Sequence, residues 1–184
     1  MMTEKKLEQI LARYQNSFTE KVYAEENEEH DILMDVFGFS PIIKKENRQY
    51  WGRELGMCWQ LLVTETCKAY CSSFQPAFRV GSDEPCDLIV DAYAIDTKYR
   101  IGSGDSGTLK KFKSCGPLLR TYYNYEPVFL ILRQDNLPAA ITACQVGTWK
   151  VYTGDASFDF IQTISGFDLK SFLTERVGEF PVYR

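Results

Sequence analysis

The chain has 184 residues, a net charge of −4 and 45% hydrophobic residues, which is the composition of a folded globular protein and excludes a disordered chain. No stretch approaches the ~20 uncharged apolar residues of a membrane span. The polar start also lacks the apolar core of a signal peptide. We therefore expect a single cytoplasmic domain over residues 1–184 that makes no membrane contact.

Cysteine and histidine usage excludes several kinds of site. The six cysteines include no Cys-x-x-Cys pair, so we expect reduced core residues and not disulfides or a zinc site. His30 is the only histidine, which excludes mechanisms that need two histidines. The cysteines are Cys58, Cys67, Cys71, Cys86, Cys115 and Cys144.

The first half of the chain predicts helices followed by a hairpin. Apolar residues at helical spacing predict a helical N-terminal arm over residues 1–45 and a long helix over residues 50–71, which Gln75-Pro76 ends. Three short strands are expected next, with a hairpin turn between the second and the third. These strands cover residues 77–80, 88–90 and 94–99.

The second half of the chain continues with a Gly/Ser loop at 102–108 and a basic helix over residues 108–123, interrupted or ended near Gly116-Pro117. The apolar run at 128–132 predicts a strand that is buried on both faces. One or two strands within 139–153 and a last helix at 168–176 complete the chain. This order predicts an α/β sandwich with a central mixed sheet flanked by helices.

Three ionisable residues converge in the predicted hairpin. Because side chains alternate along a strand, Asp96 and Lys98 share one face. Asp87 starts the preceding strand, and a short hairpin brings it near Asp96. Two carboxylates that repel each other favour a bound divalent cation, and Mg²⁺ prefers such oxygen ligands together with substrate phosphates. The pattern predicts a Mg²⁺ site on Asp87 and Asp96, with Lys98 orienting or activating an attacking water for phosphodiester hydrolysis.

The segment from Asp87 to Lys98 resembles the PD-(D/E)XK signature of the nuclease superfamily that contains most type II restriction endonucleases. Asp87 matches the first acid, Asp96 the second acid and Lys98 the lysine, although Pro85 stands one place earlier than the usual proline. The resemblance implies a restriction-endonuclease-like fold with a catalytic core over residues 50–135. It also implies a Mg²⁺-dependent endonuclease that cuts double-stranded DNA at a specific short site.

Members of this family often add a glutamate from the helix before the hairpin. Glu54 and Glu65 lie eleven residues apart, which places them on one face of a straight helix. Gln60 could take the same role. We choose Glu54, because it stands beside Arg53 near the start of the helix.

Local charge predicts where DNA would bind. Residues 98–120 carry a net charge of +5 although the whole chain is acidic, and phosphate binding depends on such local patches. The mobile, polar loop at 102–108 is suited to base-edge contacts in a groove. The residues expected to contact DNA are Arg100, Ser103, Asp105, Ser106, Lys110, Lys111 and Lys113.

Two other functions stay open at this stage: a junction-resolving or repair nuclease of the same superfamily, and a non-catalytic DNA-binding domain on that scaffold. A restriction enzyme that cuts both strands of a palindrome needs two sites, so we expect a homodimer. Apolar residues near both ends of the chain offer surface for it. They are Leu7, Ile10, Leu11, Phe158, Phe160, Ile161 and Phe172.

Overall fold

The computed structural model describes residues 30–38, 40–102, 104 and 106–182, apart from the side chain of Ser106. Over this part the chain forms a five-stranded mixed open sheet and seven helices. The helices are α2 (Ile32–Phe37), α3 (Pro41–Glu46), α4 (Arg48–Tyr70), α5 (Ser106–Tyr123), α6 (Pro138–Val146), α7 (Asp155–Ser165) and α8 (Leu169–Thr174). The strands are β1 (Gln75–Pro76), β2 (Leu88–Val90), β3 (Tyr93–Lys98), β4 (Glu126–Ile131) and β5 (Lys150–Thr153).

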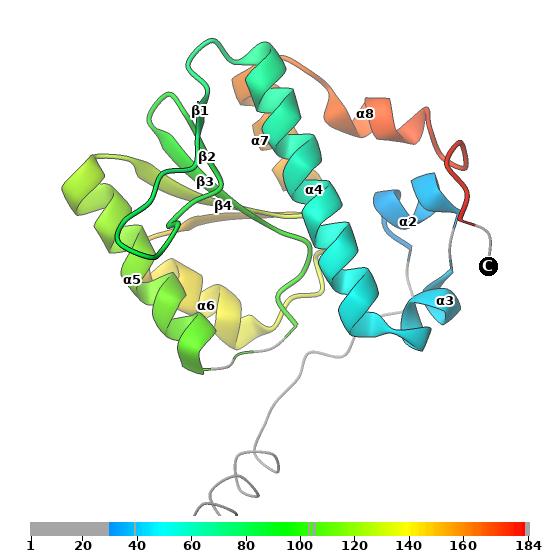
Figure 1. Cartoon of the computed structure of the whole chain (residues 1–184), viewed down its shortest axis with the longest axis horizontal. Helices are drawn as coiled ribbons and strands as arrows, with labels where there is room; N and C mark the ends of the chain where they lie inside the picture. Colours follow the sequence, from blue (N-terminus) through cyan, green and yellow to red (C-terminus); the bar gives the residue numbers. More distant parts are fainter. Residues whose placement is uncertain (1–29, 39, 103, 105, 183–184) are drawn as a thin grey trace, which may run out of the picture.

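The sheet has the spatial order β1-β2-β3-β4-β5. β2 pairs antiparallel with both β1 and β3, whereas β3–β4 and β4–β5 are parallel. Helices α4 and α7 cover one face of the sheet, and α5 and α6 cover the other (Figure 1). The α/β architecture with a mixed sheet flanked by helices is therefore confirmed.

Strand β4 is buried on both faces, as its continuous apolar run predicts. Val128 and Leu130 pack in the core beneath α4 and α7, while Phe129 and Ile131 pack in the core beneath α5 and α6. A central strand between two helical layers has no polar face, which explains the absence of alternation.

The long helix α4 forms as its sequence predicts. Asn47 caps it by accepting a hydrogen bond from the Tyr50 amide at 3.0 Å. The buried side chains repeat every four residues, so one stripe of the helix faces the sheet. Trp59 Nε1 donates to the Leu130 carbonyl at 3.1 Å and ties the helix to β4. The stripe consists of Trp51, Leu55, Trp59, Val63 and Cys67.

Several predicted elements differ from the structure. The strand expected at 77–80 is wrong: β1 lies at Gln75–Pro76, and Val80 only bridges to Asp83. The helix does not stop near Gly116-Pro117, because α5 continues to Tyr123 with buried apolar residues on both sides of Pro117. Of the one or two strands expected within 139–153, the structure forms one, β5, and residues 138–146 instead form the helix α6.

The chain ends also differ from the expectation. The last part of the chain adds α7, which the sequence interpretation missed, before the expected last helix α8. Within the arm expected over 1–45, the structure describes α2 and α3, while Leu7, Ile10 and Leu11 lie outside the described residues. Phe158, Phe160 and Ile161 are buried inside the protein's own core, so they offer no surface for a dimer.

The cysteines are mostly core residues, as the sequence predicts. All six are free thiols, and all except Cys58 are buried. Among the described residues, no helix is both long and apolar enough to cross a membrane.

A close approach between α5 and the turn after α6 generates the first prediction. A Cβ on Gly116 would lie 1.8 Å from the Gly147 carbonyl oxygen, so Gly116→Ala forces the two backbones apart. We expect it to lower the free energy of unfolding by about 1–3 kcal/mol in urea titrations, despite the higher helix propensity of alanine. Gly52→Ala in α4 is the control, because nothing lies within 4 Å of its Cβ, and it should stabilise by about 0.5–1 kcal/mol. Equal effects of the two substitutions would contradict the close packing.

Candidate active site

The carboxyl end of β3 opens into a cavity of about 300 Å³. Asp96 and Lys98 both line it, as the alternation along the strand predicts. Helix α5 forms the opposite wall with Thr108, Lys111 and Phe112. The carboxyl ends of strands in open α/β sheets are where ligands commonly bind. This cavity is therefore the candidate active site.

Asp96 and Lys98 form an ion pair inside the cavity. Lys98 Nζ donates to Asp96 Oδ1 and, at 3.0 Å, to the Thr97 carbonyl oxygen. The Asp96 side chain is only 13% exposed. Burial raises the pKa of Asp96 to about 6; the Lys98 ammonium limits this rise, and the charge of Asp87 adds to it. The carboxylate of Asp96 is thus a desolvated charge at neutral pH, held mainly by Lys98.

Asp87 lies on the α4 side of the hairpin. Its Oδ1 accepts a hydrogen bond from Gln60 Nε2 at 2.8 Å. Its Oδ2 accepts from the Thr97 amide at 2.7 Å and from the Thr97 hydroxyl at 2.6 Å. The negative charge of Asp87 acts on Asp96 through space. The hydrogen-bond partners of Asp87 are Gln60 and Thr97.

The sequence predicts two carboxylates, Asp87 and Asp96, as metal ligands. The described residues contain no group of three or more His, Cys, Asp or Glu side chains placed to hold a metal ion. Mg²⁺ commonly binds through one or two carboxylates and takes its other ligands from waters and phosphate oxygens, so carboxylate chemistry suits this ion. Asp96 lines the cavity, whereas Asp87 does not. Among the described residues, Gln60 donates to Asp87 Oδ1, whose second lone pair can still accept a cation.

The third acid expected on the long helix is not at the site. Glu54 pairs with Arg53 at 2.9 Å, and with Glu65 it lines a different, apolar groove between α4 and α8. Gln60, the alternative that the sequence analysis kept open, is the α4 side chain that contacts Asp87. Gln60 lies six positions after Glu54, so the two side chains point about 120° apart around the helix axis.

The residues expected to contact DNA occupy different positions. Lys111 and Arg100 line the cavity, whereas Lys110 and Lys113 do not, although all three lysines are exposed on α5. Ser103 and Asp105 lie outside the described residues, as does the side chain of Ser106, which begins α5. The Arg100 side chain is only 12% exposed, and its Nε donates to Asp135 Oδ2 at 2.9 Å. Direct base contact by Arg100 stays a prediction.

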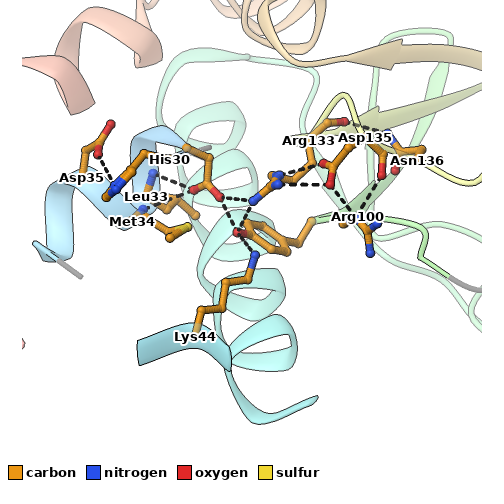
Figure 2. A network of polar contacts seen from close by, with 11 residues as sticks. His30, Leu33, Met34, Asp35, Lys44, Arg100, Arg133, Asp135 and Asn136 are labelled. Carbon is orange, nitrogen blue, oxygen red and sulfur yellow. Dashed lines mark hydrogen bonds and ion pairs between the residues drawn. The ribbon is translucent and has the colours of Figure 1, made fainter. Parts of the chain in front are cut away.

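A polar network anchors the strand end that carries the site (Figure 2). Arg133, which follows β4, lies at its centre with a side chain only 5% exposed. Arg133 donates to Asp135 Oδ1 at 2.8 Å and to Asp31 Oδ2 at 3.1 Å. The Tyr99 hydroxyl also donates to Asp31 and accepts from Lys44 at 3.0 Å. The network thus connects α2 and α3 to the residue that directly follows Lys98.

The two segments that follow β3 and β4 also pair through their backbones. The Leu132 amide donates to the Lys98 carbonyl at 3.0 Å, and the Arg133 amide donates to the Tyr99 carbonyl at 2.9 Å. Burial opposes ionisation of Asp135, but hydrogen bonds from Arg133 outweigh it and hold the pKa of Asp135 below its ordinary value. Asp135 is therefore a stable anion that binds Arg100, one of the residues that line the cavity.

Sequence reasoning did not identify Thr97, Tyr99, Arg133 or Asp135 as residues that support the site. Thr97 occupies the variable position of the acid-any-Lys motif, so no motif marks it. The pairing of Arg133 with Asp31 spans 102 positions, and it depends on α2 lying against the end of the sheet. The one available signal was an Arg and an Asp directly after a buried strand.

Comparisons of this chain with protein-family models, with curated proteins and with solved structures find no match. The interpretation of the cavity therefore depends on its own geometry and chemistry.

The network generates a stability prediction. Arg133→Leu leaves Asp31 and Asp135 without their shared cation, and removing one partner of a buried ion pair costs about 3–5 kcal/mol. Arg79→Leu is the control, because its pair with Glu84 is exposed and should change stability by less than about 1 kcal/mol. The free energies of unfolding come from urea titration followed by fluorescence. Equal losses for the two variants would show that the network does not stabilise this end of the sheet.

Proposed function

We propose that this protein is a Mg²⁺-dependent endonuclease of the PD-(D/E)XK type, acting as a type II restriction enzyme on double-stranded DNA. The observation that carries the proposal is the placement of Asp96 and Lys98 together in one cavity, with Asp87 hydrogen-bonded to Thr97 between them. The order α4-β1-β2-β3-α5-β4 also agrees with what the resemblance implies, in which a helix and strand follow the acid-any-Lys strand.

The charge of the cavity supports a phosphodiester substrate. Its described lining includes one carboxylate, Asp96, and three cationic side chains, Lys98, Arg100 and Lys111. A net positive cavity in an acidic protein attracts a phosphate group locally. Asp87 and Asp96 would hold Mg²⁺, which would polarise the phosphate and stabilise the developing negative charge.

Hydrolysis joins a water oxygen to phosphorus and breaks one bond from phosphorus to a deoxyribose oxygen, which then takes up a proton. Burial by itself lowers the pKa of Lys98, but the charges of Asp96 and Asp87 outweigh it and hold that pKa above its ordinary value. The ammonium of Lys98 is therefore charged at neutral pH. Its role in this proposal is to orient the water and stabilise the transition-state charge, and not to abstract a proton.

Two active sites are needed to cut both strands of a palindrome, so the proposal includes a homodimer. The apolar residues expected to form it near the C-terminus are mostly internal. Exposed apolar side chains on α4, such as Met57 and Leu61, are a more suitable surface for a second copy.

Incubation with plasmid DNA tests the proposal. In Mg²⁺ we expect discrete fragments, and in EDTA we expect no cleavage. Ca²⁺ should support DNA binding in gel shifts with little cleavage, because its coordination is longer and looser than that of Mg²⁺. Nicked or branch-specific products would favour a repair or junction-resolving nuclease. Binding without cleavage under every metal condition would leave a DNA-binding domain and reject the proposed enzyme.

A further inference from the structure

We propose that Lys111 contacts the scissile phosphate and is a catalytic residue, distinct from its neighbours Lys110 and Lys113. The inference depends on the proposed function and makes it more specific. All three lysines are expected from the sequence to contact DNA, but only Lys111 lines the cavity.

The face of α5 that Lys111 occupies is the wall of the cavity. Four α5 residues line the cavity, and their spacing of three, one and three places them in a single stripe. At 3.6 residues per turn, Lys110 and Lys113 each lie roughly 150° from the centre of this stripe, and both are exposed. They can meet DNA only along a different side of the helix. The stripe consists of Thr108, Lys111, Phe112 and Cys115.

Lys111 also differs from the other cationic residues of the cavity. Lys98 is paired with Asp96, and Arg100 is paired with Asp135. Within the described part of the chain, no carboxylate lies within ion-pair distance of Lys111. The uncompensated positive charge of the cavity is therefore concentrated on Lys111, which leaves its ammonium available to an incoming anion.

Lys111 and Asp96 line the same cavity, so both can act on one bound group. A phosphate in the cavity would thus lie between the Asp96–Lys98 pair on β3 and Lys111 on α5. From the opposite wall, Lys111 can neutralise charge on a non-bridging phosphate oxygen, and that charge must be stabilised in the transition state.

A phosphate titration tests the contact without requiring cleavage. Inorganic phosphate is added to the metal-free protein while the amide NMR signals of the cavity residues are followed. We expect Lys111→Ala to weaken phosphate binding at these residues by about tenfold or more. Lys111→Arg should retain most of the affinity, and Lys113→Ala should bind like the wild type. Equal affinities for Lys111→Ala and Lys113→Ala would overturn the inference, whether or not the protein cuts DNA.

Single-turnover cleavage in Mg²⁺ tests the role in catalysis. We expect Lys111→Ala to slow cleavage of bound DNA by about 10²–10³-fold, the usual effect of removing one transition-state donor. Lys110→Ala and Lys113→Ala should weaken DNA binding and change the bound-state rate less than about threefold. If the wild type cuts DNA and Lys111→Ala cuts at the same bound-state rate, Lys111 is not catalytic and the nuclease proposal stands. If the wild type cuts no DNA, the nuclease proposal and the catalytic role of Lys111 fail together. The phosphate titration then shows by itself whether Lys111 binds phosphate.

Discussion

The parallel pairing of β3 with β4 is the constraint on which the candidate site depends. It places Lys98 beside Ile131 and requires the chain to cross over the sheet between the two strands. Helix α5 makes this crossover, and its inward stripe becomes the wall that faces Asp96 and Lys98. The polar end of β3, the apolar strand β4 and the helix α5 thus enclose the cavity together. Neither the hairpin nor α5 could form it alone. Burial of β4 on both faces holds this arrangement in place.

The site combines groups that are unfavourable when considered singly. Asp96 is a desolvated carboxylate close to the charge of Asp87, and its elevated pKa reflects the energetic cost of ionising it. Lys98 offsets part of this cost, and the network around Arg133 connects the strand end to α2 and α3. A surface ion pair would need no such support, because its charges remain hydrated. The extent of the polar support is the strongest physical reason to regard the Asp96–Lys98 pair as functional.

Local pattern was sufficient to predict α4, the hairpin and β4, but not the helices α6 and α7 that also pack in the core. The stripe of α4, the hairpin of β2 and β3 and the apolar run of β4 each follow from the spacing of a few neighbouring residues, and so does the shared face of Asp96 and Lys98. Predictions failed where distant contacts decide the outcome. Helix α5 continues through Pro117 because Phe112 and Leu119 pack on the sheet, and the sequence alone cannot reveal that packing. Glu54 was preferred over Gln60 because it stands beside Arg53 near the start of the helix, whereas the orientation of α4 brings Gln60 to Asp87. The network of Arg133 joins segments that no local pattern connects.

The central claim is that the Asp96–Lys98 pair takes part in phosphodiester hydrolysis. Single-turnover cleavage by Asp96→Asn and Lys98→Ala tests this claim most directly. Each variant is compared with the wild type in Mg²⁺ after thermal unfolding has verified that it is folded, and Asp155→Asn on the exposed start of α7 serves as the control. The account predicts that both site variants slow cleavage at least about 100-fold and that the control is unchanged. It also predicts that Asp96→Asn binds metal-free DNA at least as tightly as the wild type, because a negative charge has been removed. Cleavage by both site variants at near wild-type rate would contradict the account and leave the pair as an ordinary structural ion pair.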